Sequence, residues 1–205
     1  MIVYEQLLDN DFQLALREGD MFFEGQGKVQ QSLRRIAQRL TEIGVDYAVA
    51  GGMAMYAHGF RRYTEDVNVL VTPEGLSKLH GQLEGLGYVR PFAASKNLRD
   101  AETGVRIDFL VSGQYPGDGK AGPIAFPLPS AVAQSRDGIQ IVSIEKLVEL
   151  KLASSRGAGR KKDLGDVQEL IRVLKLPLEL SAQLHESVRT VYEELWNDVQ
   201  TPSSD

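Results

Sequence analysis

Two segments of the chain carry acidic and amide side chains inside runs of strand-forming residues. Residues 66–71 read D-V-N-V-L-V, so Asp66 and Asn68 share one face of a predicted strand, because strand side chains alternate between faces. Residues 105–111 read V-R-I-D-F-L-V and place Asp108 at the centre of a second strand, where an unpaired carboxylate would be costly. Oxygen ligands of this kind suit hard cations such as Mg²⁺. The three side chains therefore predict a metal site.

A pair of glycines precedes these strands. The apolar run Tyr47 to Ala50 stops at Gly51 and Gly52, and helix-favouring residues follow, so a strand is predicted to pass into a helix at the glycines. Free N–H groups at the start of a helix, together with its positive dipole end, bind phosphate. Glycine also lets a ligand approach the backbone closely. The turn is therefore predicted to bind a triphosphate.

In this order the motifs resemble a known superfamily. They are G-G-x-A at residues 51–54, G-x-R-R-x-T-x-D-V-N at residues 59–68, the later Asp108, and E-K-L-V-E-L-K and R-K-K-D-L-G-D-V-Q-E-L-I at residues 145–151 and 160–171. Over roughly residues 30–175 the pattern is similar to the DNA polymerase β-like minimal nucleotidyltransferases. Within that superfamily it looks most like the branch of AbiEii-type toxins and related uncharacterised proteins.

The resemblance implies an α+β fold, in which a mixed β-sheet flanked by helices is followed by a C-terminal helical segment. It also implies a nucleotidyltransferase that moves a nucleotide from an NTP to a hydroxyl of RNA, protein or a small molecule, as the toxin of a toxin–antitoxin or phage-defence module. Asp66, Asn68 and Asp108 would be catalytic and hold Mg²⁺ or Mn²⁺, and Asp108 would orient or deprotonate the acceptor hydroxyl. The residues expected to bind nucleotide and phosphate are Gly51, Gly52, Arg62, Thr64, Lys151, Arg160 and Lys162. A cognate antitoxin or a second copy of the chain is an expected partner.

Two positions depart from the family pattern. The family has two acidic residues spaced by one, whereas Asp66 is followed by Asn68 here. An amide oxygen can bind a metal but brings no negative charge, which would weaken two-metal catalysis. Three explanations stay open: a degenerate member that binds nucleotide without turnover, an active enzyme that tolerates Asn, or a variant altered to trap a bound state. The alternative function is therefore a catalytically weakened nucleotide-binding or regulatory protein. Met53 stands where many relatives carry Ser, so the backbone alone would hold the phosphate.

Composition limits the class of protein. The 205 residues include 23 Lys and Arg against 28 Asp and Glu, and the net charge of −5 argues against broad nonspecific coating of nucleic acid. The lack of cysteine excludes disulfides and thiolate metal sites, and the three histidines lack the spacing of zinc ligands. No run approaches the roughly 20 apolar residues of a membrane span, and the start shows no signal-peptide pattern. A cytoplasmic protein without membrane contact is expected.

The chain is expected to form one catalytic unit with helices around it. We divide it into an N-terminal arm or helix (1–27), a nucleotidyltransferase-like core (28–143), a C-terminal helical segment (144–199) and a flexible tail (200–205). Periodicity predicts helices over 28–43, 73–86, 144–152, 164–174 and 180–199, and strands over 47–50, 66–71, 105–111 and 139–143. Residues 113–135 are rich in Gly and Pro and are predicted to form a loop or lid. Residues 4–23 form either a helix packed on the core or a dimerisation arm.

Several polar residues also have a purely structural interpretation. Asp163 and Asp166 share a face of a predicted helix and are expected to have structural roles. Lys151 is either a phosphate contact or a lysine whose stem packs on apolar surface. The segment G-Q-G-K at residues 25–28 lacks the spacing of a phosphate loop and is predicted to be a turn. The basic residues that are either site residues or solvated surface side chains are Arg61, Arg62, Arg156, Arg160, Lys161 and Lys162.

Overall fold

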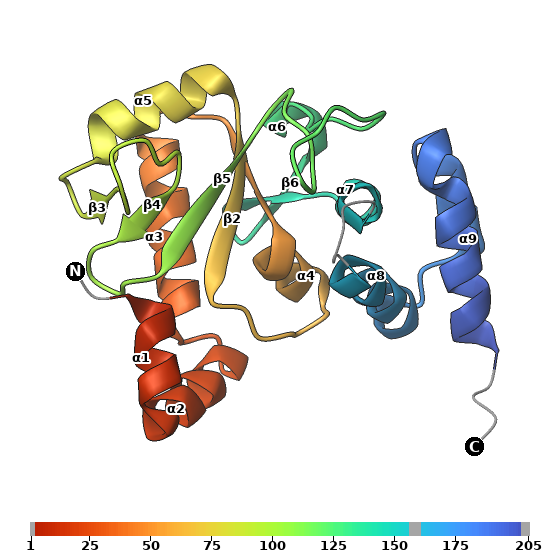
Figure 1. Ribbon diagram of the computed structural model, residues 1–205, viewed down its shortest axis with the longest axis horizontal. Coiled ribbons are helices and arrows are strands. Elements are labelled where there is room, and N and C mark those ends of the chain that lie inside the picture. The colour runs from red at the N-terminus through yellow and green to blue at the C-terminus, as the bar shows by residue number, and fades with distance from the viewer. Residues whose placement is uncertain (1–2, 156–160, 202–205) are drawn as a thin grey trace.

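Seven strands form one sheet in the part of the chain that the structure describes (Figure 1). The structure is a computed structural model and describes residues 3–155 and 161–201. The strand order is β3-β4-β5-β2-β1-β7-β6. The strands are β1 (Tyr47–Ala50), β2 (Asp66–Val71), β3 (Tyr88–Val89), β4 (Leu98–Asp100), β5 (Arg106–Val111), β6 (Ala133–Arg136) and β7 (Ile139–Val142).

Helices flank this sheet and continue beyond it toward the C-terminus. They are α1 (Tyr4–Asn10), α2 (Phe12–Phe23), α3 (Lys28–Glu42), α4 (Gly51–His58), α5 (Pro73–Leu83), α6 (Pro129–Val132), α7 (Ile144–Ser155), α8 (Lys161–Leu174), a 3-10 helix (Leu178–Gln183) and α9 (Glu186–Gln200). The sheet is mixed, because β1 runs antiparallel to β2 while β2 runs parallel to β5. The fold is therefore α+β, with a mixed sheet flanked by helices and a C-terminal helical segment, as predicted. Within the described residues, no helix is long and apolar enough to cross a membrane.

Alternation along the central strand β2 separates the core from the polar face. Val67 and Val69 are fully buried, and α3 packs against this strand. Asp66 and Asn68 point to the opposite face and stay partly exposed, because successive strand residues alternate. The sheet thus uses one face for the apolar core and leaves polar side chains on the other.

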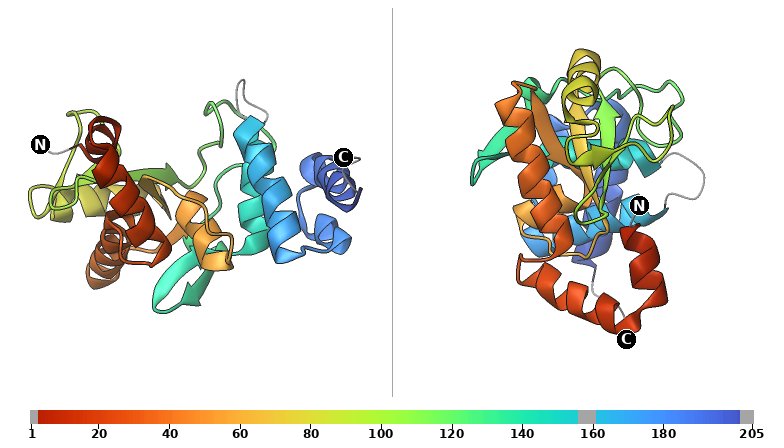
Figure 2. Two further views of the ribbon diagram at one scale, coloured as in Figure 1. Left: turned by 90° about the horizontal axis from the view of Figure 1, so that it is seen from below. Right: turned by 90° about the vertical axis from the view of Figure 1, so that its left-hand side faces the viewer.

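The N-terminal segment, predicted to be a helix packed on the core or a dimerisation arm, folds as two helices, and Tyr4 and Phe22 from them are buried in the core. Asp11 separates the helices, since its side chain accepts a hydrogen bond from the Leu14 amide at 3.0 Å and caps α2. The buried Tyr4 hydroxyl lies 2.9 Å from that of Tyr63 and donates to Glu18 at 3.2 Å. Burial raises the pKa of Tyr4. Figure 2 shows α1 and α2 at the opposite end of the molecule from α9. Dimerisation through this segment stays a prediction.

Most predicted boundaries are confirmed to within a few residues. The turn at residues 25–28 leads directly into α3, which ends at Glu42 before Gly44 with a φ of +61°. Thr72 caps α5 by accepting a hydrogen bond from the Gly75 amide at 3.0 Å. The strand-to-helix change at Gly51 is also as predicted.

The predicted helix over residues 73–86 is too long. α5 ends at Leu83, because Gly85 and Gly87 follow with φ values of +78° and +95°, which favour glycine and end the helix. Leu86, which the predicted helix includes, lies beyond α5 and is 66% exposed.

Two other boundaries are wrong. The expected loop over residues 113–135 ends in α6 and β6, because Asp137 and Gly138 form a positive-φ turn that pairs β6 with β7. The expected helix over residues 180–199 is interrupted at His185, whose ring Nδ1 accepts a hydrogen bond from the Ser187 amide at 3.2 Å and caps α9. The short strands β3 and β4 were not predicted. The predicted tail begins at the last residue of α9, and its residues 202–205 lie outside the described residues.

Candidate functional site

The three predicted metal ligands meet on one face of the sheet. β2 and β5 are parallel neighbours whose register pairs Asn68 with Asp108 and Asp66 with Arg106. Paired residues of neighbouring strands project to the same side, so the four polar side chains form a compact group. The convergence of Asp66, Asn68 and Asp108 is therefore as predicted.

Asp66 is oriented by hydrogen bonds to both of its carboxylate oxygens. Thr64 donates through Oγ1 to Oδ1 at 2.6 Å, and Asn68 donates through Nδ2 to Oδ2 at 3.2 Å. Because the Asn68 nitrogen is used in this way, its amide oxygen is the atom left to act as a ligand.

Asp108 is the least satisfied member of the group. Its Oδ2 lies 3.2 Å from Arg106 Nε, whereas its buried Oδ1 has no hydrogen-bond partner within the described residues. Burial raises the pKa of Asp108, the Arg106 charge opposes that rise, and the nearby Asp66 carboxylate adds to it. A carboxylate with a raised pKa and a free oxygen is suited to accept a proton or a cation.

The two glycines bring the start of α4 close to this group. A Cβ at Gly51, where φ is +60°, would lie 2.8 Å from Asn68 Nδ2. A Cβ at Gly52 would lie 2.8 Å from the Thr64 side chain. Both contacts are too short for real carbon atoms, so glycine is what allows the helix to start directly against the acidic group. The first turn of α4 therefore lies against Asn68 and Thr64, and it lines the same cavity as Asp66 and Asp108.

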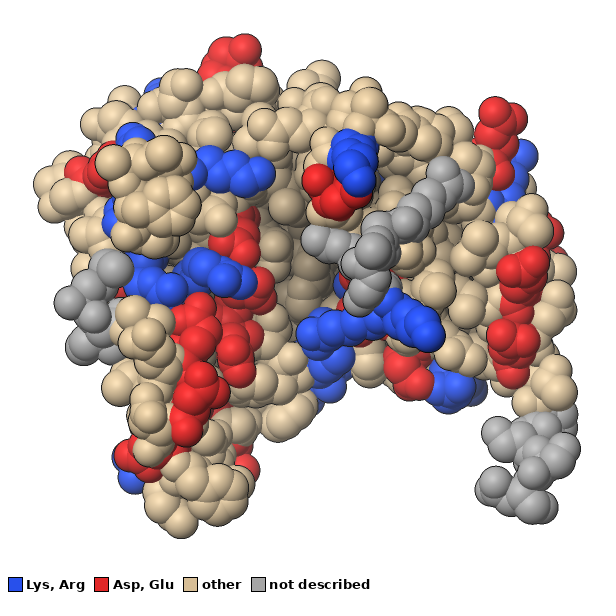
Figure 3. Space-filling view, in the orientation of Figure 1, with Lys and Arg blue, Asp and Glu red and all other residues tan. Residues whose placement is uncertain are grey.

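A cavity of about 1040 Å³ lies over this face. Its walls come from the start of α4, from β2 and β5, from residues 113–119 of the predicted lid, and from α7 and α8. Figure 3 shows a hollow between acidic side chains on the side of β2, β5 and α1 and basic side chains at the start of α8. The predicted site residues that line the cavity are Gly51, Gly52, Arg62, Thr64, Asp66, Asn68, Asp108, Lys151 and Lys162. Arg156 and Arg160 lie outside the described residues.

The basic wall of the cavity is held by two aspartates. Lys151 Nζ lies 3.1 Å from Asp163 Oδ1 and 2.7 Å from Asp166 Oδ2. Arg62 Nε lies 3.2 Å from Asp166 Oδ1. The side chains of Lys151 and Asp166 are only 11% and 7% exposed, so Lys151 is not a solvated surface lysine. Asp163 and Asp166, for which structural roles are expected, hold the positively charged side chains of Lys151 and Arg62 at the cavity wall through these ion pairs.

Arg106 is the site residue that sequence reasoning missed. It lies 3.2 Å from Asp108 and 3.5 Å from Asp66, and its side chain is 44% exposed at the cavity mouth. The alternation in V-R-I-D places it on the face of Asp108 and could have revealed it. Lys96, which also lines the cavity, lies on the segment before β4 and gives no comparable signal.

The donor set fits one magnesium ion better than two. Within the described residues, no group of three or more His, Cys, Asp and Glu side chains is arranged to hold a metal. Two carboxylates and one amide oxygen are present instead, and Mg²⁺ is commonly held by one or two carboxylates together with substrate phosphates. The unpartnered Oδ1 of Asp108 is an acceptor that such an ion would satisfy.

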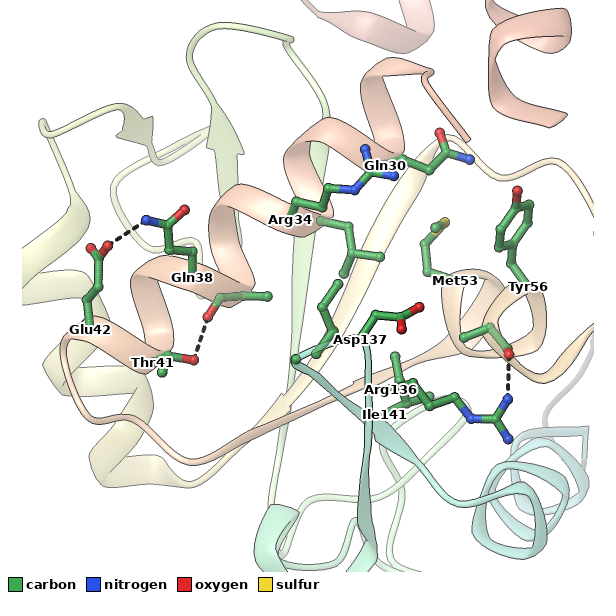
Figure 4. A pocket seen from close by; sticks show the side chains of 15 residues that line it. Gln30, Arg34, Gln38, Thr41, Glu42, Met53, Tyr56, Arg136, Asp137 and Ile141 are labelled. Carbon is green, nitrogen blue, oxygen red and sulfur yellow. Dashed lines mark hydrogen bonds between the residues drawn. The ribbon is translucent and has the colours of Figure 1, made fainter. Parts of the chain in front are cut away.

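A second hollow lies elsewhere, between α3, α4 and the β6–β7 hairpin (Figure 4). Its volume is about 670 Å³, and Met53 points into it. Several polar side chains around it already have partners: Thr41 donates to the Ala37 carbonyl, and Arg136 donates to that of Ala57. None of the predicted site residues line it. Because Met53 faces this hollow, it offers nothing to the cavity over Asp108.

No protein-family model matches the sequence, and no curated protein matches it. Similar solved structures exist. A candidate nucleotidyltransferase from Thermotoga maritima is 15% identical, with a TM-score of 0.46 over 69% of this chain and 91% of that one. A candidate nucleotidyltransferase from H. pylori is 15% identical, with a TM-score of 0.45 over 85% of this chain and 82% of that one. ANT(2″)-Ia in complex with adenylyl-2″-tobramycin is 12% identical, with a TM-score of 0.44 over 83% of this chain and 98% of that one.

Proposed function

We propose that the protein is a metal-dependent nucleotidyltransferase. The observation that carries this proposal is the register of β2 and β5, which sets Asp66 and Asn68 beside Asp108, with Asn68 packed against the helix start at Gly51. A carboxylate group next to free helix N–H groups suits a phosphate chain together with its cation. The cavity has room for a nucleotide, since its volume of about 1040 Å³ is at the upper end of ligand pockets.

In the proposed reaction, the triphosphate rests against the N-terminus of α4. Lys151 and Arg62 stand on the facing wall, where positive charge stabilises the phosphates. The acceptor hydroxyl attacks the α-phosphorus, its proton passes to the Asp108 carboxylate, and the α–β bridging bond breaks to release pyrophosphate. Bound Mg²⁺ or Mn²⁺ would supply charge neutralisation at the phosphates. The raised pKa of Asp108 supports its assignment as the base.

The biological role that we propose rests on the sequence motifs alone. The likeness to AbiEii-type toxins favours a toxin of a toxin–antitoxin or phage-defence module, with a cognate antitoxin as its partner. RNA, a protein and a small molecule stay equal candidates for the acceptor. The basic start of α8, with Lys161 and Lys162, would be available to an RNA backbone.

The proposal is tested by transfer of label from each α-labelled NTP, with Mg²⁺ or Mn²⁺, to total RNA, to protein and to small hydroxyl compounds. Label from the α-phosphate should appear in an acceptor, while label from the γ-phosphate should appear only in pyrophosphate. Asp108→Ala should abolish transfer while its circular dichroism spectrum matches that of the wild type. Turnover retained by Asp108→Ala would overturn the assignment of this residue.

The second candidate is a catalytically weakened protein that binds nucleotide and regulates a partner. It is favoured by Asn68, which leaves the site with two carboxylates, Asp66 and Asp108. This alternative predicts nucleotide binding with little turnover, and it predicts that Asn68→Asp tightens metal binding or restores transfer, because a third carboxylate adds charge. If Asn68→Asp changes neither metal affinity nor transfer, the alternative loses its basis.

A further inference from the structure

The positively charged guanidinium of Arg106 contacts both carboxylates of the site. Its Nε is 3.2 Å from Asp108 Oδ2 and its Nη2 is 3.5 Å from Asp66 Oδ2. The register of β2 and β5 pairs Arg106 with Asp66, and Asp108 lies two residues further along β5 on the same face. The two strands therefore place the guanidinium beside both carboxylates. A planar guanidinium with several donors is well suited to bridge two carboxylates.

Arg106 contacts one oxygen of each carboxylate that would hold a metal ion. Both oxygens of Asp66 also accept hydrogen bonds, Oδ1 from Thr64 and Oδ2 from Asn68, whereas Asp108 Oδ1 is buried and has no partner among the described residues. The Oδ2 atoms of both residues face Arg106. A divalent cation held by both carboxylates would therefore lie close to the guanidinium, and two positive charges at one pair of carboxylates oppose each other.

We propose that Arg106 is a built-in, displaceable cation that competes with the divalent metal for Asp66 and Asp108. This inference rests on the proposed function and concerns how the same site is regulated. Without metal, Arg106 neutralises the two carboxylates and keeps them together. When the metal is bound, the guanidinium leaves the carboxylates.

The exposed position of Arg106 leaves its guanidinium free to find another partner once it is displaced. The Arg106 side chain is 44% exposed, whereas those of Asp66 and Asp108 are 23% and 21% exposed, so the guanidinium is more accessible to solvent than either carboxylate. A displaced guanidinium on a flexible stem finds a new partner in the phosphates of a bound nucleotide. Metal and nucleotide thereby assist each other, because each stabilises the state in which Arg106 is displaced.

The test is the binding of Mn²⁺ alone and of Mn²⁺ with a non-hydrolysable NTP analogue, measured by calorimetry and by electron paramagnetic resonance of free Mn²⁺. Arg106→Gln removes the competing charge and should bind Mn²⁺ alone about tenfold more tightly than the wild type, within the range of measured site-to-site couplings. The analogue should then improve Mn²⁺ binding less than it does in the wild type.

The matched control is Arg90→Gln. Arg90 is also an arginine in an ion pair, at 2.8 Å from Glu84, and it does not line the cavity. This variant changes the net charge equally and should bind Mn²⁺ as the wild type does. Asp108→Asn identifies the part of the Mn²⁺ signal that comes from the site. If thermal melting shows that Arg106→Gln is misfolded, Arg106→Met repeats the test with another uncharged side chain.

The outcomes separate this inference from the proposed function. Mn²⁺ binding that depends on Asp108 but is unchanged or weaker in Arg106→Gln overturns the role of Arg106 and leaves the function standing. Equal tightening in Arg90→Gln also overturns it, because net charge would then explain the effect. If no binding depends on Asp108 even with the analogue present, both proposals fail.

Discussion

Asp66 depends on Thr64 for its orientation. The Thr64 hydroxyl donates to Asp66 Oδ1 at 2.6 Å, within the range of strong hydrogen bonds to a charged acceptor. The same side chain fills the space left by the missing Cβ of Gly52. Thr64 therefore couples the carboxylate group to the start of α4.

Replacing Thr64 by Val should lower kcat/KM for nucleotidyl transfer by roughly tenfold or more, because a carboxylate that is no longer oriented binds its cation less well. The free energy of unfolding should fall by about 1.5–3 kcal/mol, the value of one hydrogen bond to a charged group. Steady-state kinetics and urea denaturation measure the two effects.

Thr41→Val is the control, since Thr41 makes its hydrogen bond to the Ala37 carbonyl within α3 and does not line the cavity. Transfer by Thr41→Val should equal that of the wild type. If Thr64→Val also keeps wild-type kinetics, Thr64 does not orient Asp66 for the reaction.

Local patterns were sufficient to predict the central residues of the site. Asp66, Asn68 and Asp108 follow from strand alternation, and Gly51 follows from the change of strand to helix. The pairing of Lys151 with Asp163 and Asp166 joins α7 to α8, so no local period could reveal it. Which oxygen of Asp108 stays unpartnered likewise depends on packing in three dimensions.

Among the elements, α4 packs its first turn closely against β2 and Thr64 because Gly51 and Gly52 have no side chains. Gly52→Ala adds a Cβ that would lie 2.8 Å from Thr64. Because Thr64 must move, we expect the free energy of unfolding to fall by roughly 1–3 kcal/mol, and we expect transfer to fall with it. Chemical denaturation and the transfer assay measure both.

Gly19→Ala in α2 is the matched control for Gly52→Ala. A Cβ at Gly19 would meet nothing within 4 Å, and alanine is favoured over glycine in a helix interior by up to about 1 kcal/mol. This variant should therefore be slightly more stable than the wild type. A Gly52→Ala protein as stable and as active as Gly19→Ala would contradict the close packing at the start of α4.

The far end of α4 is joined to β7 by His58, whose ring Nε2 lies 2.8 Å from the Val142 carbonyl oxygen. Burial lowers the pKa of His58 below its usual 6.5. Between the lowered value and 6.5, the unfolded chain binds more protons than the folded one, so this contribution to stability is present above 6.5 and is lost as the pH falls through the lowered pKa.

We therefore expect the difference in free energy of unfolding between the wild type and His58→Gln to shrink as the pH is lowered below 6.5. Urea denaturation at a series of pH values, on both proteins at one ionic strength, measures this difference. A difference that stays constant with pH, or grows toward acid, would show that His58 is not held neutral in the folded protein.

Elements with a strong period or a clear cap could be predicted, and those formed by distant pairing could not. α3 has a regular apolar stripe, and α5 begins at a Thr72 cap followed by Pro73. β6 is short and largely exposed, so its sequence lacks alternation, and only the Asp137–Gly138 turn signals its pairing with β7. β3 and β4 contain so few residues that no period is visible in them.

At the scale of the molecule, the cavity joins parts of the chain that lie far apart in the sequence. The sheet supplies the carboxylates, and α7 and α8 supply cations on the opposite wall. The predicted lid approaches α7, since a Cβ at Gly117 would lie 3.2 Å from the Ser154 carbonyl oxygen. Residues 113–119 of the predicted lid line the cavity, which agrees with a loop that covers a substrate. The covering itself stays a prediction. The arrangement of charges across the cavity could not be predicted from the sequence, because it depends on how α7 and α8 pack beside the sheet.

The most direct measurement of the central claim is nuclear magnetic resonance of the labelled protein with Mn²⁺ and a non-hydrolysable NTP analogue. Paramagnetic Mn²⁺ broadens the signals of nearby nuclei, so it reports where the metal–nucleotide complex sits. We predict selective broadening of the backbone amides of Gly51, Gly52, Asn68 and Asp108, and its loss in Asp108→Asn. Broadening that centres on the hollow between α3 and the β6–β7 hairpin, or that is the same in Asp108→Asn, would contradict a nucleotide and metal site at the carboxylates of β2 and β5.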